Sequence, residues 1–178
     1  MDVLEVLERY PAPGAPFELA AFCGTWRVIR TSLPFWRKRY GPTITYAPLP
    51  GDPLGDGARR LDDDVRYFTA AGAERHVRGI DVQDPSRPRL FRWRGKPWYL
   101  RWTTSDWCVL DHDPRCADWA VTYFAPTLFT PAGIDLYARA AEPEPPVIAA
   151  IEDKLRGHPA LAAFVPQLFA PAAGGGAG

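Results

Sequence analysis

The residues of this 178-residue chain that could do chemistry are isolated polar side chains within otherwise apolar segments. They are Arg30, Tyr46, Asp64, Tyr67, Arg78, Asp81 and Tyr123. In an apolar cavity a few such groups orient a ligand, and a desolvated Asp or Tyr can act as an acid or a base. A solvated or structural role is the alternative for each of them. A shift of one residue in strand register exchanges the two faces of a strand, so the pattern leaves open which of them point inward.

Sequence motifs of the common catalytic and metal sites are absent. The chain contains no GxSxG, HExxH, CxxC or phosphate-binding loop, and its only histidines are His76, His112 and His158. A haem would require an inward histidine, which His76 could supply, although a single histidine in a strand is more often structural. We therefore expect no cofactor and no metal.

Three consecutive carboxylates, Asp62-Asp63-Asp64, are the closest approach to a metal or acid-base cluster. Neighbouring residues of a strand point to opposite faces, so only Asp62 and Asp64 could converge on one ligand. The alternative is a solvated strand end.

Composition narrows the classes of partner. Lys plus Arg and Asp plus Glu number 21 each, so the chain has no basic footprint for nucleic acid or for an anionic membrane. The aromatic content of 13% suits either an aromatic core or a pocket for an apolar ligand. No apolar run approaches the roughly 18 residues of a membrane span. We expect a small hydrophobic partner and a monomer or homodimer.

The cysteines and the amino terminus favour a cytoplasmic protein. Three cysteines at irregular spacing match neither a zinc site nor a disulfide framework, so we expect reduced thiols. The first ten residues carry Asp2, Glu5 and Glu8 and lack the basic and then apolar pattern of a secretion signal.

Short strands must position the candidate residues, which makes the chain all-β. Alternating or β-branched segments, separated by turn residues, begin at Gly24 and continue as 43–47, 61–69, 76–82, 90–93, 98–104, 107–111, 118–124 and 133–139. Helical spacing occurs at 3–7, 17–22, 145–157 and 161–168, the last interrupted by Pro166. We expect an N-terminal helical segment over 1–21, a β-barrel over 22–140, C-terminal helices over 141–170 and a disordered tail over 171–178.

The strand that begins Gly24-Thr25-Trp26 resembles the first motif of the lipocalin (calycin) family. Ala117-Asp118-Trp119 is similar to the second motif, of which it keeps the Asp and an aromatic residue, and Arg139 after the last strand is similar to the third. The resemblance implies a closed antiparallel barrel whose base is closed by Trp26, with Arg139 packed across the indole. An open β-sandwich is the alternative. These motifs are structural in the family, so they specify no reaction.

The same resemblance implies a ligand inside the barrel and a first connection, Pro34–Tyr40, that arches over its mouth. Trp36 and Arg37 would contact the ligand there, and Arg37 would favour a carboxylate, enolate or carbonyl oxygen. The alternative is a solvated basic loop with Trp36 folded back as a cover. The predicted ligand-binding residues are Trp36, Arg37, Tyr46, Tyr67, Arg78, Trp102 and Tyr123.

Two functions stay open on these grounds. One is an intracellular lipocalin-like protein that holds a hydrophobic small molecule in the barrel. The other is a cofactor-independent enzyme, a cyclase or isomerase of a microbial secondary metabolite such as a polyketide or terpenoid, because some lipocalin-like barrels that this chain resembles catalyse such steps by holding a reactive conformer. The absence of a catalytic motif favours the first, and a cytoplasmic location favours the second.

Overall fold

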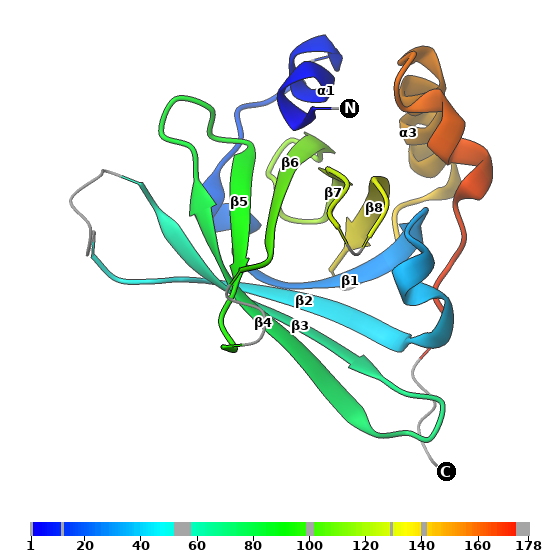
Figure 1. The fold of residues 1–178 in the computed structure, drawn as a ribbon. Coiled ribbons are helices and arrows are strands. Elements are labelled where there is room, and N and C mark those ends of the chain that lie inside the picture. Colours follow the sequence, from blue (N-terminus) through cyan, green and yellow to red (C-terminus); the bar gives the residue numbers. More distant parts are fainter. Residues whose placement is uncertain are drawn as a thin grey trace.

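A computed structural model describes residues 2–11, 13–51, 58–98, 102–128, 130–139 and 142–173, and eight strands in these ranges form a closed antiparallel barrel (Figure 1). The strands are β1 (Gly24–Thr31), β2 (Tyr40–Pro48), β3 (Arg60–Phe68), β4 (Glu74–Gln83), β5 (Leu90–Gly95), β6 (Thr104–His112), β7 (Trp119–Phe124) and β8 (Gly133–Ala138). Each strand pairs with the next, and β8 closes the barrel on β1. The predicted closed all-β barrel is confirmed.

Five short helical segments accompany the barrel in the described residues, four where the sequence predicted helical spacing and one in the predicted connection 34–40. They are α1 (Val3–Arg9), α2 (Leu19–Phe22), the 3-10 helix η1 (Pro34–Lys38), α3 (Pro145–Gly157) and the 3-10 helix η2 (Ala162–Gln167). We call the barrel end that carries η1 the mouth and the opposite end the base. Within the described residues no helix is both long and apolar enough to cross a bilayer.

One predicted strand is wrong. The segment 98–104 was predicted as a strand of its own, but β5 pairs with β6, from Leu90 opposite Cys108 to Arg94 opposite Thr104. Trp98 and Trp102 belong to the connection between these strands and are about four-fifths exposed. Residues 99–101 of the predicted strand lie outside the described residues. The alternation of Trp98 and Trp102 therefore corresponds to two exposed side chains and not to an inward face of a strand.

The barrel base is closed by Trp26, a fully buried side chain that begins β1. Its indole Nε1 donates to the Phe22 carbonyl at 2.7 Å, and the Arg139 guanidinium lies over its ring at 4.0 Å from the ring centre. Arg139 also donates to the carbonyl oxygens of Ala21, Phe22 and Cys23 at 2.7 to 3.0 Å. The predicted contact between Arg139 and Trp26 is confirmed.

Gly24 makes this closure possible in two ways. Its φ of 111° lies in the region that favours glycine. A Cβ at this position would also lie 2.5 Å from Nη1 of Arg139. Glycine therefore precedes the tryptophan because the arginine occupies the space that any side chain would need.

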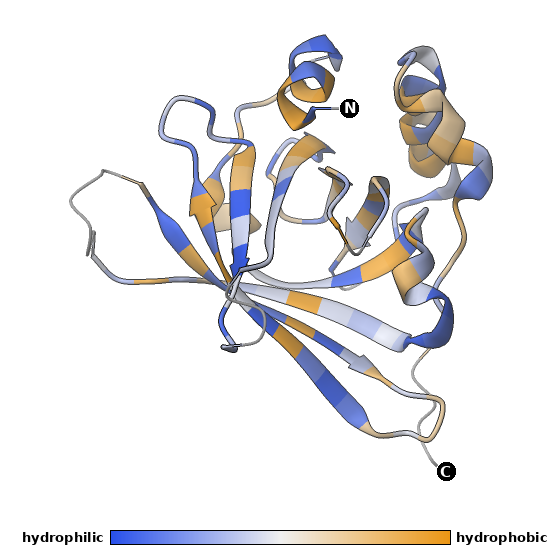
Figure 2. Cartoon of the chain, in the orientation of Figure 1, coloured by the Kyte–Doolittle hydropathy of each residue, from blue (hydrophilic) through white to orange (hydrophobic). Residues whose placement is uncertain are grey.

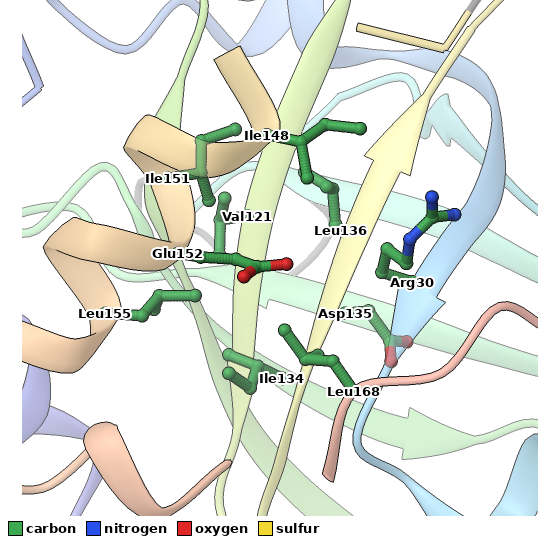
Figure 3. Close-up of a pocket in the computed structure, with 10 residues that line it drawn as sticks. All are labelled: Arg30, Val121, Ile134, Asp135, Leu136, Ile148, Ile151, Glu152, Leu155 and Leu168. Carbon is green, nitrogen blue, oxygen red and sulfur yellow. The ribbon is translucent and has the colours of Figure 1, made fainter. Parts of the chain in front are cut away.

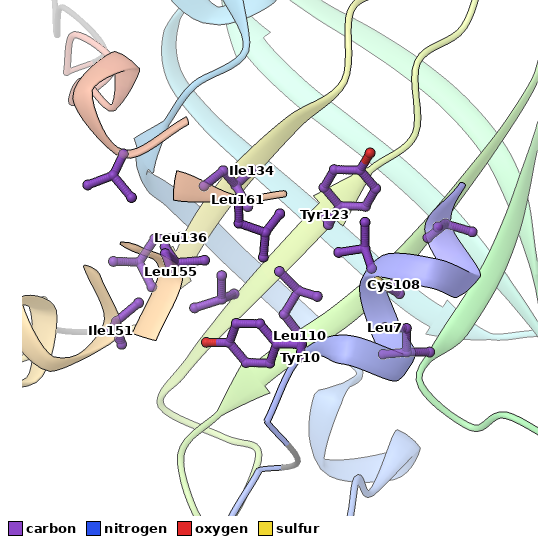
Figure 4. Packing of buried hydrophobic residues seen from close by; sticks show 14 of the residues in the cluster. Leu7, Tyr10, Cys108, Leu110, Tyr123, Ile134, Leu136, Ile151, Leu155 and Leu161 are labelled. Atoms are coloured by element: carbon purple, nitrogen blue, oxygen red, sulfur yellow. The ribbon is translucent and has the colours of Figure 1, made fainter. Parts of the chain in front are cut away.

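Alternation along the strands creates two apolar cores (Figure 2). The inner core lies inside the barrel and includes Trp26, Val28, Tyr46 and Trp107. The outer core lies on the opposite face of β6, β7 and β8, beneath α1, α3 and η2 (Figures 1 and 4). These three strands are consequently buried on both faces.

The gap between α3 and the barrel is narrow (Figure 3). Ile148, Ile151 and Leu155 of the helix face Val121 and Leu136 of the sheet, and the space left between the two layers is about 10 Å³. That is about the room of a single water molecule. The outer core is therefore a packed interface.

The C-terminal segment runs back along the barrel after η2. Phe169 forms a bridge with Thr31, with bonds of 2.9 Å in both directions, and the Ala172 carbonyl accepts from the Gly41 amide at 2.8 Å. The first three residues of the predicted disordered tail, 171–173, are thus described, and one of them is bonded to β2; residues 174–178 lie outside the described residues.

Candidate functional site

A cavity of about 170 Å³ lies inside the barrel beneath the mouth. Six aromatic side chains line it: Phe35, Trp36, Tyr46, Trp93, Trp107 and Phe124. Aliphatic residues supply most of the remaining wall, and its polar residues are Ser105, Asp63 and Asp135. The cavity is thus apolar over most of its surface and carries two carboxyl groups.

The η1 segment covers the cavity at the mouth. Trp36 is buried there, and its neighbour Phe35 packs edge-on against it with ring centres 4.8 Å apart. The Arg39 guanidinium lies over Phe35 at 3.6 Å and over Tyr67 at 5.0 Å. Pro34 starts this 3-10 turn, where its fixed φ suits the first helical position. An aromatic cover held by an arginine therefore lies over part of the cavity at the mouth.

Stacked aromatic rings form the deeper wall. The Trp107 ring stacks on Tyr46, Phe91 and Phe124 with centre-to-centre distances of 5.4, 4.5 and 5.8 Å. Offset stacking of this kind stabilises aromatic pairs beyond their simple burial. The rings of Trp107, Tyr46 and Phe124 thereby give this wall of the cavity an aromatic surface.

Asp135 projects into the barrel from β8 and is 1% exposed. Its Oδ2 accepts from Trp36 Nε1 at 3.2 Å, and the Thr31 hydroxyl also donates to this carboxyl group. Its Oδ1 has no hydrogen-bond partner. Burial raises the pKa of Asp135 to about 7, against the two hydrogen bonds that lower it. Near neutral pH this carboxyl group therefore gains or loses a proton readily.

Asp63 projects into the cavity from β3, with Asp81 of β4 close behind it. Trp93 donates a hydrogen bond to Asp63, and Trp107 Nε1 donates to Oδ1 of Asp81 at 2.7 Å. Burial and the charge of Asp81 raise the pKa of Asp63 well above its usual range, and burial raises the pKa of Asp81 to about 7. One oxygen of each carboxyl group, Oδ1 of Asp63 and Oδ2 of Asp81, has no partner.

Gly79 gives Trp93 its position beside Asp63. Gly79 is paired with Asp63 across β3 and β4, and a Cβ on it would lie 2.0 Å from Nε1 of Trp93. The indole of Trp93 occupies the space that a side chain at position 79 would need. Glycine in the strand thus allows an indole N–H to reach the carboxyl group.

Two buried tyrosines lie between the carboxyl groups. The hydroxyls of Tyr46 and Tyr137 are 3.4 Å apart, and Tyr137 also bonds to Thr122. Burial raises the pKa of both tyrosines well above the usual range, and Tyr137 experiences the charges of Asp135 and Asp63. Both tyrosines therefore stay neutral within the electric field of the acidic groups of β8 and β3.

Three of the residues predicted for the site lie at the cavity or its mouth. Trp36 and Tyr46 line the cavity. Tyr67 shares the inward face of β3 and packs against Phe35, with ring centres 6.2 Å apart. Trp36 is folded back over the cavity, as in the alternative considered for the connection 34–40.

The other four predicted residues do not line the cavity. Arg37 is exposed and lies over Phe169 at 4.5 Å, and Arg78 lies on the outer face, where it bonds to Asp64. Trp102 is exposed in the connection between β5 and β6. Tyr123 faces the outer core beneath α1 (Figure 4). Helices cover the outer face of β7, so both faces of this strand carry apolar residues and the sequence pattern does not show which face points into the barrel.

Reasoning from sequence missed Asp63 and Asp135. Asp63 was placed between Asp62 and Asp64, which alone were expected to converge, but those two face outward and pair with Lys96 and with His76. The available signal was the shared face of Leu61, Asp63 and Val65, an apolar face with one acid in it. Asp81, by contrast, was among the candidates.

His76, the residue considered as a haem ligand, does not point into the barrel. His76 lies on the outer face between Asp64 and Glu74, at 2.7 and 3.0 Å. Within the described ranges no group of three or more His, Cys, Asp or Glu side chains is arranged to hold a metal ion.

Comparison with known proteins identifies similar structures but no similar sequence. No family model matches the chain, and no curated protein sequence matches it. Lobster apocrustacyanin A1 is similar in structure, with a TM-score of 0.62 at 12% identity over 88% of this chain and 79% of that one. Apocrustacyanin C2 has a TM-score of 0.62 at 12% identity over 93% and 91% of the two chains. The siderocalin Ex-FABP has a TM-score of 0.58 at 15% identity over 88% and 97%.

Proposed function

From the lipocalin fold of this chain, we propose that it binds one small, largely apolar molecule inside the barrel. The observation that carries the proposal is the cavity inside the barrel with six aromatic side chains in its wall. Removing apolar surface from water contributes about 25 cal/mol per Å², so such a wall binds an apolar ring strongly for its size. The siderocalin among the similar structures is described as having dual ligand specificities, which supports a binding role for the fold.

The cavity volume limits the ligand. A cavity of about 150 Å³ holds one benzene molecule. The 170 Å³ found here therefore suits one ring with a short substituent. A whole terpenoid or polyketide would require Phe35 and Trp36 to move away from the mouth. We propose a one-ring ligand, or a larger ligand of which one ring enters.

An intracellular setting is part of the proposal. Cys23, Cys108 and Cys116 are free thiols, and burial raises the pKa of Cys108 and Cys116 to about 12. Thiols of this kind suit a reducing compartment.

A cavity-filling substitution tests the proposal. Val77 lines the cavity from β4, whereas Val82 of the same strand lies on its outer face. Toluene and 2-phenylethanol are titrated while tryptophan fluorescence and the thermal midpoint are followed. A ligand at 100 times its Kd stabilises the folded protein by about 2.7 kcal/mol. Val77→Phe should abolish the stabilisation and Val82→Phe should retain it; equal binding by both variants would place the ligand elsewhere.

Catalysis on the same ligand is a second candidate, favoured by one observation. Asp135 lines the cavity with a pKa raised to about 7 by burial, which is the range in which a carboxyl group serves both as acid and as base at neutral pH. An isomerase or cyclase would then lose turnover in Asp135→Asn while it keeps ligand affinity. Unchanged recovery of every candidate substrate after incubation would remove this candidate.

A further inference from the structure

The carboxyl groups of the cavity have no cationic partner. Asp63 and Asp135 line it and are 6% and 1% exposed, and each has an oxygen without a hydrogen-bond partner. None of the residues that line the cavity, in the part of the chain that the structure describes, is Lys, Arg or His. Carboxylates buried in proteins are normally paired with a cation or fully hydrogen-bonded.

We propose that the cavity binds a small aromatic amine, whose ammonium group donates to Asp63 and whose ring contacts Trp107. The inference rests on the proposed function and adds the chemical class of the ligand. It replaces the anionic or carbonyl ligand expected from the sequence, because Arg37, on which that expectation depended, lies outside the cavity.

Asp63 is the position at which a cation is stabilised most. Asp81 lies directly behind it, and these two desolvated carboxyl groups disfavour each other's ionised form. An ammonium group beside Asp63 adds a hydrogen-bond donor to a carboxyl group that lines the cavity, and it relieves that repulsion at the same time. Asp135 stands on another strand, where Trp36 and Thr31 already donate to it, so it contributes less.

The aromatic walls suit a cation as well as a ring. Trp93, whose indole bonds to Asp63, and Tyr46 also line the cavity. The faces of such rings attract an ammonium group, most strongly where water is excluded. Arg39 at the mouth lies on Phe35 and Tyr67 and does not line the cavity.

Three probes of equal shape and different charge test the inference. Phenethylamine, 2-phenylethanol and phenylacetate share one ring and a two-carbon arm or its equivalent, and they are cationic, neutral and anionic at about pH 7.5. Their Kd values are measured by calorimetry on the full chain. We expect the amine to bind at least about tenfold more tightly than the alcohol, and the anion to bind most weakly.

Two neighbouring substitutions locate the ammonium group. Asp63→Asn should lower the affinity for phenethylamine about tenfold or more and change that for 2-phenylethanol by less than about twofold. Asp62→Asn removes an outward carboxylate of the same strand, one that pairs with Lys96 and that acts on Asp63 only through its charge, and it should change all three Kd values by less than about twofold.

The outcomes separate this inference from the proposed function. Equal or tighter binding of the alcohol would show that the carboxyl groups act as neutral acids, and it would overturn the inference while the binding function stands. Retention of the amine preference in Asp63→Asn would overturn the assignment of the ammonium site. Failure of all three probes to bind would overturn both proposals.

Discussion

Asp135 shows how one residue can set the pH behaviour of this barrel. Its carboxyl group is surrounded by Trp36, Thr31 and Tyr137 in a site that holds no cation, so ionisation there is opposed by desolvation. Because the pKa is raised on folding, from 3.8 to about 7, the folded state binds this proton more tightly than the unfolded state. The contribution to stability is complete below about pH 4 and is lost as the pH rises to about 7.

Replacing Asp135 by Asn should therefore stabilise the protein at alkaline pH. The difference in the free energy of unfolding between Asp135→Asn and the parent should increase from pH 4 to pH 8, to at most about 4 kcal/mol. Urea unfolding at several pH values measures it, with Asp153→Asn on the exposed face of α3 as the control. A difference that does not vary with pH would mean that Asp135 is not desolvated.

Arg139 is a residue that lysine, the most similar amino acid, cannot replace. A lysine has neither the planar guanidinium that lies over Trp26 nor donors placed to reach three carbonyl groups at once. Arg139→Lys should lower the free energy of unfolding by about 2 to 4 kcal/mol. Arg156→Lys, at an exposed ion pair of α3, should change it by less than about 0.5 kcal/mol. Similar unfolding midpoints for these two variants would contradict the assigned role of Arg139.

At the scale of elements, α3 is attached to the barrel by apolar packing and by one ion pair. Ile151 and Leu155 are buried in the outer core, and Lys154 reaches over the edge of β6 to Asp111 at 2.7 Å. The Asp111 side chain is 2% exposed and the Lys154 side chain 47%. The buried carboxylate of Asp111 is therefore neutralised by a lysine of a helix that lies outside the barrel.

Replacing Lys154 alone should lower the free energy of unfolding more than replacing Lys154 and Asp111 together. Lys154→Met leaves Asp111 buried without its cation, and we expect a loss of about 1 to 3 kcal/mol. Adding Asp111→Asn to Lys154→Met should restore most of that loss. Chemical unfolding of the two single variants and the double variant measures the coupling, and additive effects would indicate that the pair contributes nothing beyond its separate residues.

At the scale of the whole molecule, the sequence predicted the parts that depend on local pattern. The closed barrel, the contact of Arg139 with Trp26 and the helix 145–157 follow from short motifs and from spacing. The cavity wall was harder to predict because every position of β7 and β8, and every position of β6 except Thr104, is at least partly buried, so that both faces of these strands are covered. Alternation then no longer distinguishes the inside from the outside, and Tyr123 was placed on the wrong face while Asp135 was missed.

The closure of the barrel base also governs how the chain is made. Arg139 and the Ala21 carbonyl that it binds are 118 residues apart, and β1 pairs with β8 across a similar length of chain. A ribosome adds about 5 to 20 residues per second, so β1 waits roughly 6 to 24 s after its own synthesis for its second neighbour. Throughout that interval the growing sheet has two open edges that can pair with other nascent chains. Translation of the last strand is thus the step that ends the period of greatest aggregation risk.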